Sequence, residues 1–432
     1  MATVRNPIYM AVVACCCLST PGWTQIREPG TADQQTGSES NSIAAVIQAR
    51  RTDLQTDRRD DNLPPEKWPG SFTVQDSDTR IRTGGFLQLD IIHDSDAIQS
   101  KGQFITDAIP TGGGSKADGA DGQTNFSISP SRLYVETRTP FDSRRLKTYI
   151  SIDMFNDELG VTAEPRLRQA YAELSDGLLG GDLLIGQAWS TTTDLEATPD
   201  VLDFRGVDSL FGRLTPQLRW SKAVGDGLKL MLALETPDNH IIEGADSLTR
   251  MPDGVLAFTW DSNSFNLMAS IIAKDLRASL NNGPVESAIG IGGSISGKIR
   301  MPYGSYPDYF MFSGTYGKGI GSSFQNAKAD AVFDPVSSGL ETLLLFGVSL
   351  AYSHSWNARM NSTLTYCCIE IYSDDAQTPD SIEGTEYSSG NLVWHMNSHW
   401  LFGIEGIWGK RGDRNRQEAS VFRTQITSRV SF

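Results

Sequence analysis

The last fourteen residues, ASVFRTQITSRVSF from Ala419 to Phe432, alternate between apolar and polar side chains with a period of two. Successive side chains of a strand point to opposite faces, so this stretch predicts a β-strand with one apolar and one polar face. The apolar face holds Phe422, Ile426, Val430 and Phe432, and the polar face holds Arg423, Gln425, Thr427, Arg429 and Ser431. A terminal strand that closes on an aromatic residue is typical of an outer-membrane β-barrel, although a soluble antiparallel sheet gives the same alternation.

The N-terminus has the pattern of an export signal. Arg5 precedes a short apolar run from Ile8 to Leu18, and Pro21 and Gly22 separate this run from a polar stretch. The run is too short to cross a bilayer as a helix. The sequence therefore predicts a cleaved signal peptide over residues 1–24.

A polar segment, residues 25–70, separates this signal from the predicted strands. Ile43, Ile47 and Leu54 are spaced so that a short helix with a narrow apolar stripe fits over residues 41–58, with coiled-coil contact as one outcome. A helix this short is marginal in isolation, so a disordered linker is the alternative. We expect a short periplasmic extension in either case.

Composition narrows the class of protein. No run of about eighteen apolar residues occurs, which excludes ordinary transmembrane helices. The 41 glycines and the 18 Phe, 12 Tyr and 9 Trp fall in many short alternating segments, as a barrel with a wet interior requires. A net charge of −15 argues against a nucleic-acid partner. Cys367 and Cys368 are adjacent and should point to opposite strand faces, so neither a disulfide framework nor a metal site follows.

From Ile81 onward the sequence contains about sixteen candidate strands, and their connections alternate between short and long. Short links are predicted at Thr139–Ser143, Ser175–Gly181, Ala223–Gly227, Asp261–Ser264, Ser355–Arg359 and Met396–His399, and long ones at Asp94–Asn125, Thr191–Phe211, Thr236–Asp253, Gly317–Gly339 and Ser373–Gly384. Short periplasmic turns and long external loops are typical of outer-membrane barrels, and an even strand count leaves both termini in the periplasm. The fold class is therefore all-β, a transmembrane antiparallel β-barrel over residues 71–432.

Individual strands show which face meets lipid. In Gly227–Glu235, four leucines at alternate positions form an unbroken apolar face. In Arg144–Phe155, apolar residues alternate with Arg145, Lys147, Tyr149, Ser151 and Asp153. A charge facing lipid at the midplane costs about 2–4 kcal/mol, so the charged face of each strand must line the lumen.

Several blocks of sequence, in order, resemble one family. They are Thr83–Asp90 (TGGFLQLD), Ser131–Pro140 (SRLYVETRTP), Arg166–Glu173 (RLRQAYAE), Leu184–Asp194 (LIGQAWSTTTD) and Pro199–Phe204 (PDVLDF). The stretch from about Ile81 to Asp238 resembles the DcaP-like porins of Gram-negative outer membranes, and the likeness thins toward the C-terminus. The resemblance implies a sixteen-stranded homotrimeric porin with a periplasmic extension, passing small anionic solutes such as aromatic dicarboxylates.

Basic residues cluster on the polar faces of the early strands, independently of that resemblance. The predicted pore-lining residues are Arg132, Arg138, Arg145, Lys147, Arg166, Arg168, Arg213 and Arg219. Rings of arginine in a pore favour anions. For five of these eight residues there is an alternative role: their side chains snorkel at a rim of the barrel, or they pair with Glu136, Asp153 or loop acids.

The long link Thr191–Phe211 has the length and position of a loop that folds inward and constricts the pore. Its charged residues are Asp194, Glu196, Asp200, Asp203, Arg205 and Asp208, which we expect opposite the basic strands, with pairing between the two sets as the alternative. The first long loop, Asp94–Asn125, holds five aspartates and two lysines, so we expect much of the negative charge to be external and solvated.

Enzyme signatures are poor. Gly292–Lys298 has the spacing of a phosphate loop, but Ile299 replaces the residue that would hold magnesium and the surroundings alternate as a strand. The five histidines form no metal spacing.

We predict no catalysis, no cofactor and no metal, and instead a porin in the Gram-negative outer membrane. The alternative is a barrel whose loops serve adhesion or surface structure. Expected partners are anionic solutes, outer-membrane lipid and the barrel assembly machinery, to which Phe432 would be the assembly signal.

Overall fold

The computed structural model describes residues 68–112, 122–155, 162–237, 240–281, 283–301, 306–337, 339–372 and 374–432. The predicted signal peptide, residues 1–24, and the predicted helix or linker within residues 25–67 lie outside the described residues. Within the part that is described, no helix is long and apolar enough to cross a membrane.

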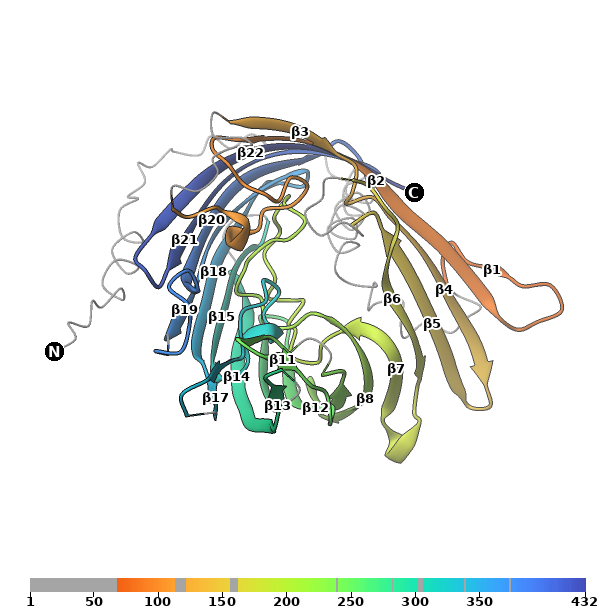
Figure 1. The fold of residues 1–432 in the computed structure, drawn as a ribbon. Helices are drawn as coiled ribbons and strands as arrows, with labels where there is room; N and C mark the ends of the chain where they lie inside the picture. Colours follow the sequence, from red (N-terminus) through yellow and green to blue (C-terminus); the bar gives the residue numbers. More distant parts are fainter. Residues whose placement is uncertain are drawn as a thin grey trace. The chain divides into compact units, whose positions relative to one another are not determined.

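The described chain forms a closed antiparallel β-barrel (Figure 1), which confirms the predicted fold class. Its sheet has nineteen strand segments, of which β1 (Phe72–Thr73) and β11 (Asp246–Ser247) are short additions and β3 and β4 are two parts of one strand, leaving sixteen barrel strands. They are β2 (Arg80–Asp94), β3 (Gln123–Ser127) with β4 (Arg132–Phe141), β5 (Arg144–Asp153), β6 (Arg166–Leu174), β7 (Asp182–Trp189), β8 (Leu214–Gly225), β9 (Leu228–Glu235), β12 (Asp253–Asp261), β13 (Phe265–Ser279), β14 (Val285–Met301), β15 (Asp308–Lys318), β18 (Leu344–Asn357), β19 (Met360–Tyr372), β20 (Ile382–His395), β21 (Trp400–Asp413) and β22 (Glu418–Ser431).

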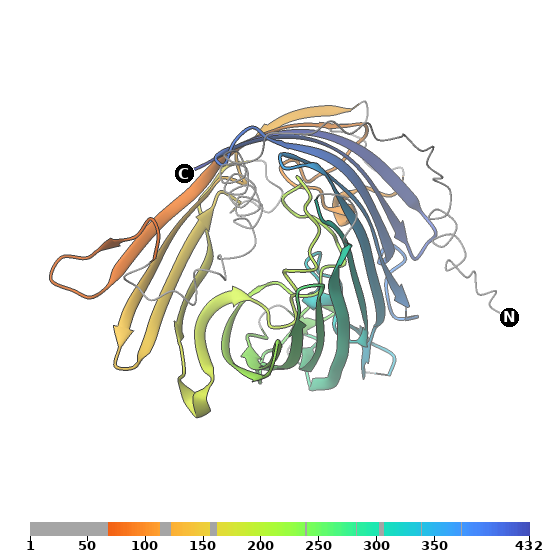
Figure 2. The ribbon, with the colours of Figure 1, turned by 180° about the vertical axis from the view of Figure 1, so that it is seen from behind.

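The first and last barrel strands close the sheet. β2 pairs antiparallel with β22 from Phe86 opposite Ser431 to Asp94 opposite Arg423. Beyond this ladder, the Phe432 N–H donates to the Gly85 carbonyl at 3.0 Å and the Gly85 N–H donates to the Phe432 carbonyl at 3.1 Å. The two strands, at opposite ends of the colour range, lie side by side when seen from behind (Figure 2). The terminal residue is thus part of the seam.

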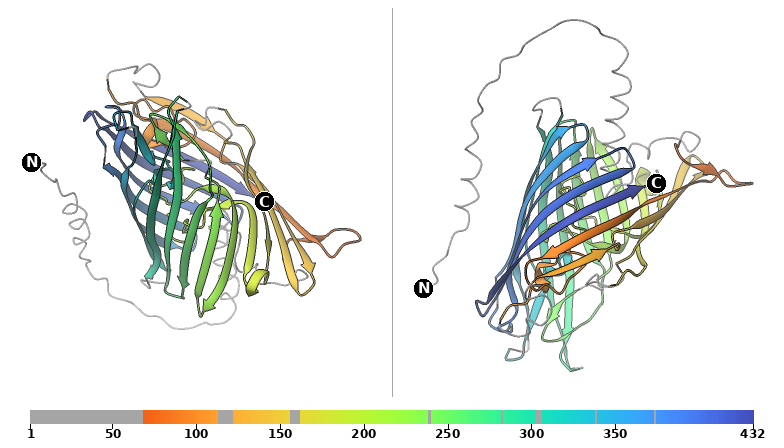
Figure 3. Two further views of the ribbon diagram at one scale, coloured as in Figure 1. Left: turned by 60° about the horizontal axis from the view of Figure 1, so that its bottom comes forward. Right: turned by 90° about the horizontal axis from the view of Figure 1, so that it is seen from above.

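Side chains alternate across the wall as the sequence predicts. On β9, Leu228, Leu232 and Leu234 are exposed on the outer face, the last with half of its surface accessible (51%). On β22, Phe422 and Ile426 face outward, whereas Arg423, Gln425 and Thr427 are buried in the interior. Barrel strands are tilted in this class of protein, and the side view shows this tilt (Figure 3). The outer face therefore suits hydrocarbon.

Connections segregate by length between the two rims, which confirms most of the predicted pattern. The short-turn rim has tight links such as 142–143, 226–227, 358–359 and 396–399, and both β2 and β22 have an end there. On the long-loop rim the prediction was incomplete, because 280–284 and 414–417 are short.

The long loops contain ordered structure that the sequence did not predict. β10 (Ile242–Glu243) pairs parallel with β16 (Ala331–Asp334), and β16 pairs antiparallel with β17 (Gly339–Thr342), so two loops build a separate three-stranded sheet. Apolar clusters lie between the loops and the wall, one including Phe104, Leu210, Tyr387 and Ile407. The interior is accordingly packed with loops on one side rather than fully wet.

The strands also show the structure of the glycine-rich stretch 292–298 and of the second barrel strand. The glycine-rich stretch 292–298 lies inside β14, in agreement with the predicted strand and against a phosphate loop, which must open a helix. The second barrel strand, which follows the first long loop, is interrupted at 128–131, between β3 and β4. Both parts still pair with β2.

Candidate pore-lining site

A cavity of about 330 Å³ lies inside the barrel, lined by early strands, by the loop 190–213 and by residues of β19 to β22. Six arginines and two aspartates line it: Arg132, Arg166, Arg168, Arg205, Arg213, Arg429, Asp200 and Asp203. They come from β4, β6, β22, the loop 190–213 and its junction with β8. The cavity is thus rich in guanidinium groups.

Asp153 of β5 holds the two arginines of β6. Arg166 donates to it with Nε at 3.0 Å and Nη2 at 2.8 Å, and Nη1 of Arg168 lies 3.2 Å from the same carboxylate. The irregular register between β5 and β6 places both arginines on the lumen side, while Leu167 between them is exposed on the outer face. One carboxylate therefore fixes two guanidiniums, and the group keeps a net positive charge.

Aromatic rings also orient these guanidiniums. The Arg168 Cζ atom lies 5.5 Å from the centroid of Trp189 and 5.2 Å from that of Phe204. Phe204 in turn stacks on Phe155 with centroids 4.1 Å apart. Cations are attracted to ring faces at these distances, so Arg168 is held between the wall and the loop.

Two further arginines flank Phe86 of β2. The Cζ atoms of Arg132 and Arg429 lie 5.3 and 4.6 Å from the ring centroid, and Nε of Arg429 donates to Gln88 at 2.7 Å. The sequence places Arg429 on the polar face of the last strand, but Arg429 is not among the eight predicted pore-lining residues. The barrel seam brings β22 beside β2 and so brings Arg429 to the cavity.

The eight predicted pore-lining residues divide into two groups. Arg132, Arg166, Arg168 and Arg213 line the cavity, whereas Arg138, Arg145, Lys147 and Arg219 lie outside it. Arg138 is fully buried, with Nε 2.9 Å from Glu136 and Cζ 4.1 Å from the centroid of Trp68. Pairing with strand carboxylates, which the sequence left open, thus applies to Arg138, Arg166 and Arg168.

The loop 190–213 folds into the lumen and contacts the wall formed by β14, β18 and β21. Ser296 of β14 donates to Asp194 at 2.8 Å, and Ser209 donates to the Val348 carbonyl of β18 at 3.0 Å. Glu405 of β21 accepts the backbone N–H groups of Leu202 and Asp203, each at 2.8 Å. The loop is therefore attached to three strands of the wall.

The acids of this loop have different surroundings. Burial raises the pKa of Asp208 to about 6, and burial also raises the pKa values of Asp194 and Asp203. Asp200 is exposed to the cavity, Glu196 is half-buried, and Arg205 contacts the carbonyl of Gln325. Arg166 and Arg168 pair with Asp153 of the wall, while the buried loop acids accept hydrogen bonds from hydroxyl and backbone groups elsewhere.

The expectation that the first long loop carries solvated acids was wrong for two of its aspartates. Asp94 is buried at the end of β2 and pairs with Arg423, with a Nε–Oδ1 distance of 2.6 Å. Asp107, in the loop 95–122, pairs with Lys328 of the loop 319–343. Asn326 of that loop reaches Asp208 at 3.3 Å. Asp118 and Asp121 lie outside the described residues. In the part of the chain that the structure describes, the loops 95–122 and 319–343 therefore fold inward as well as the loop 190–213.

Among the described residues, no group of three or more His, Cys, Asp or Glu side chains has the arrangement needed to hold a metal ion. The chemistry that this cavity offers is electrostatic: guanidinium groups beside water-accessible space. Such groups bind carboxylate or phosphate oxygens through paired N–H donors.

A sequence model of the DcaP outer membrane protein family matches residues 71–432. The chain belongs to this family. It is accordingly an outer-membrane β-barrel of the porin type, which confirms the predicted family and location. A comparison with curated protein sequences finds no match.

Solved structures share the fold. The outer membrane channel DcaP of Acinetobacter baumannii is 17% identical, with a TM-score of 0.71, and the match covers 84% of this chain and 100% of that one. An anion-selective porin from Comamonas acidovorans is 10% identical (TM-score 0.55; 82% and 100% covered), and a Salmonella typhi OmpF complex with daunomycin is 9% identical (TM-score 0.52; 84% and 100% covered). At these identities the likeness establishes the fold.

Proposed function

We propose that this member of the DcaP family forms a water-filled channel through which small, preferentially anionic solutes diffuse passively across the outer membrane. The observation that carries the proposal is the composition of the cavity lining, with six arginines and two aspartates. A guanidinium stays charged at any relevant pH and binds a carboxylate with two parallel hydrogen bonds. Several such groups along one path offer an anion successive weak sites.

The arginines at the cavity affect a passing solute more than the negative net charge of the whole chain does. The net charge of −15 is distributed over the whole chain, and surface charges are screened over about 8 Å at physiological salt. Arg132, Arg168 and Arg429 are at the cavity itself. Dicarboxylates are the solutes we propose within the anionic class, since paired guanidiniums at two places, Arg166 with Arg168 and Arg132 with Arg429, match two carboxylates.

We further propose a homotrimer, assembled in outer-membrane lipid by the barrel assembly machinery, with Phe432 as the assembly signal. One similar structure, OmpT of Vibrio cholerae (11% identical, TM-score 0.50), is described in a trimer form, which supports the proposal by analogy of fold. The proposed constriction residues are Asp194, Glu196, Asp200, Asp203, Arg205 and Asp208, of which Asp200, Asp203 and Arg205 line the cavity, while Asp194 and Asp208 would hold the loop in place.

The second candidate function is a barrel whose surface loops serve adhesion or structure. The inward folding of the loops 190–213 and 319–343 favours the channel, because these segments contact one another and the inner wall, as at Phe211 opposite Phe324. Loops that pack inward offer less surface to an external partner.

The test is electrical. Purified protein in a planar bilayer should give stepwise conductance, and a salt gradient should give a reversal potential on the anion side. Absence of conductance by a folded, heat-modifiable protein would favour the adhesion alternative. Conductance with cation preference would retain the channel and overturn the anionic solutes.

A further inference from the structure

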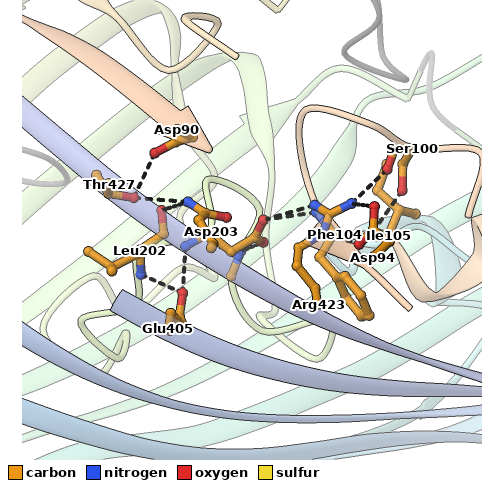
Figure 4. Close-up of polar contacts among 12 residues, drawn as sticks. Asp90, Asp94, Ser100, Phe104, Ile105, Leu202, Asp203, Glu405, Arg423 and Thr427 are labelled. Carbon is orange, nitrogen blue, oxygen red and sulfur yellow. Dashed lines mark hydrogen bonds and ion pairs between the residues drawn. The ribbon is translucent and has the colours of Figure 1, made fainter. Parts of the chain in front are cut away.

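The tip of the loop 190–213, residues 200–206, is attached to the inner wall by a buried carboxylate of β21. Glu405 is fully buried, and its Oε2 atom accepts the N–H groups of both Leu202 and Asp203 at 2.8 Å (Figure 4). Asn391 of β20 bridges the same contact, since its Nδ2 atom donates to the Asp200 carbonyl at 2.8 Å and lies 3.3 Å from Glu405 Oε1. Buried backbone N–H groups are costly to leave without an acceptor, so two of them on one buried carboxyl oxygen make a strong attachment.

The wall is also shaped to receive the tip. The side chain of Leu202 occupies the space above Gly403, where a Cβ atom would lie 2.6 Å from Leu202 Cδ1. Gln425 of β22 donates to the Leu202 carbonyl at 3.1 Å. Both polar groups of the Leu202 backbone are therefore satisfied by the wall, and a larger residue at Gly403 would displace the Leu202 side chain from its place on the wall.

Arg423 joins the first inward loop to the same place. It binds Asp94 through Nε and Nη2 at 2.6 and 3.0 Å and donates to the Ser100 carbonyl at 2.9 Å. Asp203 accepts the Phe104 N–H at 2.8 Å and lies 4.0 Å from Arg423 Nη1. Figure 4 shows these contacts continuing from one loop to the other. The tip is thus fixed from two sides.

The opposite side of the tip faces the cavity. Leu202 and Asp203 line it, whereas Glu405 and Arg423 do not. Phe204, the next residue, carries the ring that contacts Arg168 at 5.2 Å. A shift of the tip would therefore move both the cavity wall and one of the two rings that orient Arg168.

From this connection we infer that Glu405 is a positioning residue for ion selectivity, which acts through Leu202 and Asp203 and touches no solute. Glu405 fixes the distance between the loop tip and the arginines of β6. Gly403, which has no side chain, leaves the room that Leu202 occupies in this position. The inference rests on the proposed channel function.

The first experiment compares Glu405→Ala and Glu405→Gln with Glu418→Ala in planar bilayers. Glu418 is a matched control, because it is an exposed carboxylate on the outer face of β22 that contacts Lys410. We expect Glu405→Ala to broaden the distribution of single-channel conductance and to reduce anion preference, while the control behaves as wild type. Glu405→Gln keeps an acceptor for the two N–H groups, so it should keep most of the wild-type conductance and anion preference.

The second experiment remains informative even if Glu405→Ala folds poorly. Gly403→Val should displace Leu202 and change conductance and reversal potential, whereas Gly314→Val should not, since a Cβ at Gly314 meets no atom within 4 Å. Heat-modifiable migration on gels verifies folding of each variant. Unaltered conductance and selectivity in folded Glu405→Ala and Gly403→Val, with a conducting wild type, would overturn the positioning role. A wild type that does not conduct would instead overturn the proposed function.

Discussion

Two sides of the lumen use lumen-facing charges differently. On the basic wall, β4 to β8, Arg132, Arg166 and Arg168 project to the cavity, and one carboxylate, Asp153, serves two of them. On the loop-bearing wall, β14 to β22, Arg423 is fully buried among carboxylates and carbonyls of the inward loops. The same alternation places both sets inside. Whether a charge acts on solutes or anchors a loop depends on what covers it.

Small residues explain why the loops settle on one wall. Added Cβ atoms at Gly347, Gly403 and Gly409 would lie 2.7, 2.6 and 2.3 Å from atoms of Phe324, Leu202 and Phe104, respectively. These three wall positions therefore admit one large side chain from each of three loops. The loop-bearing wall gains apolar packing at these positions, and the open, water-accessible space lies between the loop tip, the basic wall and the parts of β19 to β22 that the loops leave uncovered.

The largest effect is expected on the loop-bearing wall. Arg423→Leu should lower the free energy of unfolding by about 3–5 kcal/mol, because it leaves Asp94 as an uncompensated buried charge. Arg166→Gln, on the basic wall, should cost about 1 kcal/mol or less, since Arg166 is partly exposed and Arg168 still pairs with Asp153. Urea unfolding of purified protein in detergent measures both. Equal losses would remove the distinction between the walls, and Asp94→Asn combined with Arg423→Leu should recover part of the loss.

The basic wall should dominate selectivity. Two unit charges 4 Å apart interact with about 1 kcal/mol at a dielectric of 80 and about 4 kcal/mol at 20, so each arginine at the cavity attracts an anion noticeably. Arg166→Gln with Arg168→Gln should therefore shift the reversal potential toward cations. Arg144→Gln with Arg145→Gln removes the same charge at the short-turn rim, outside the cavity, and should shift it much less. Identical shifts in the two double variants would mean that overall charge, and not the cavity, sets selectivity.

A smaller effect is expected at the seam between the two walls. Deleting Phe432 removes two backbone hydrogen bonds to Gly85, worth about 1–3 kcal/mol together, and should reduce the amount of folded protein in the outer membrane. Phe432→Ala keeps the backbone and isolates the role of the ring. If deletion has no effect on the folded amount, the terminal residue is dispensable. If Phe432→Ala is as deficient as the deletion, the aromatic group itself is needed.

The smallest effect concerns pH. Burial raises the pKa of Asp208 to about 6, above its ordinary value of 3.8. The folded state therefore favours the protonated form, so this carboxyl makes the loops less stable as pH rises through about 6. We expect single-channel noise to be greater at pH 8 than at pH 5, and this difference to shrink in Asp208→Asn. An undiminished difference in that variant would assign the pH dependence to another group.

Strand alternation is local, and the sequence therefore predicted it well. The outward leucines of β9, the inward Arg423, Gln425 and Thr427 of β22, and the strand character of 292–298 follow from a period of two that needs no knowledge of neighbours. The inward loop 190–213 was also predicted, from its length and its position after the fifth strand, whereas the similarly long loops 95–122 and 319–343 were not predicted to fold inward.

Tertiary structure alone decided which charges reach the cavity. Arg138 and Arg132 lie on the same face of β4, yet one is buried against Glu136 and Trp68 and the other lines the cavity. Depth along the lumen depends on strand register and on which loop covers the site, and both are set by residues far apart in sequence, as for Asp94 with Arg423 or Leu202 with Glu405. The sequence by itself determined the barrel and its two faces, and long-range packing determined the site.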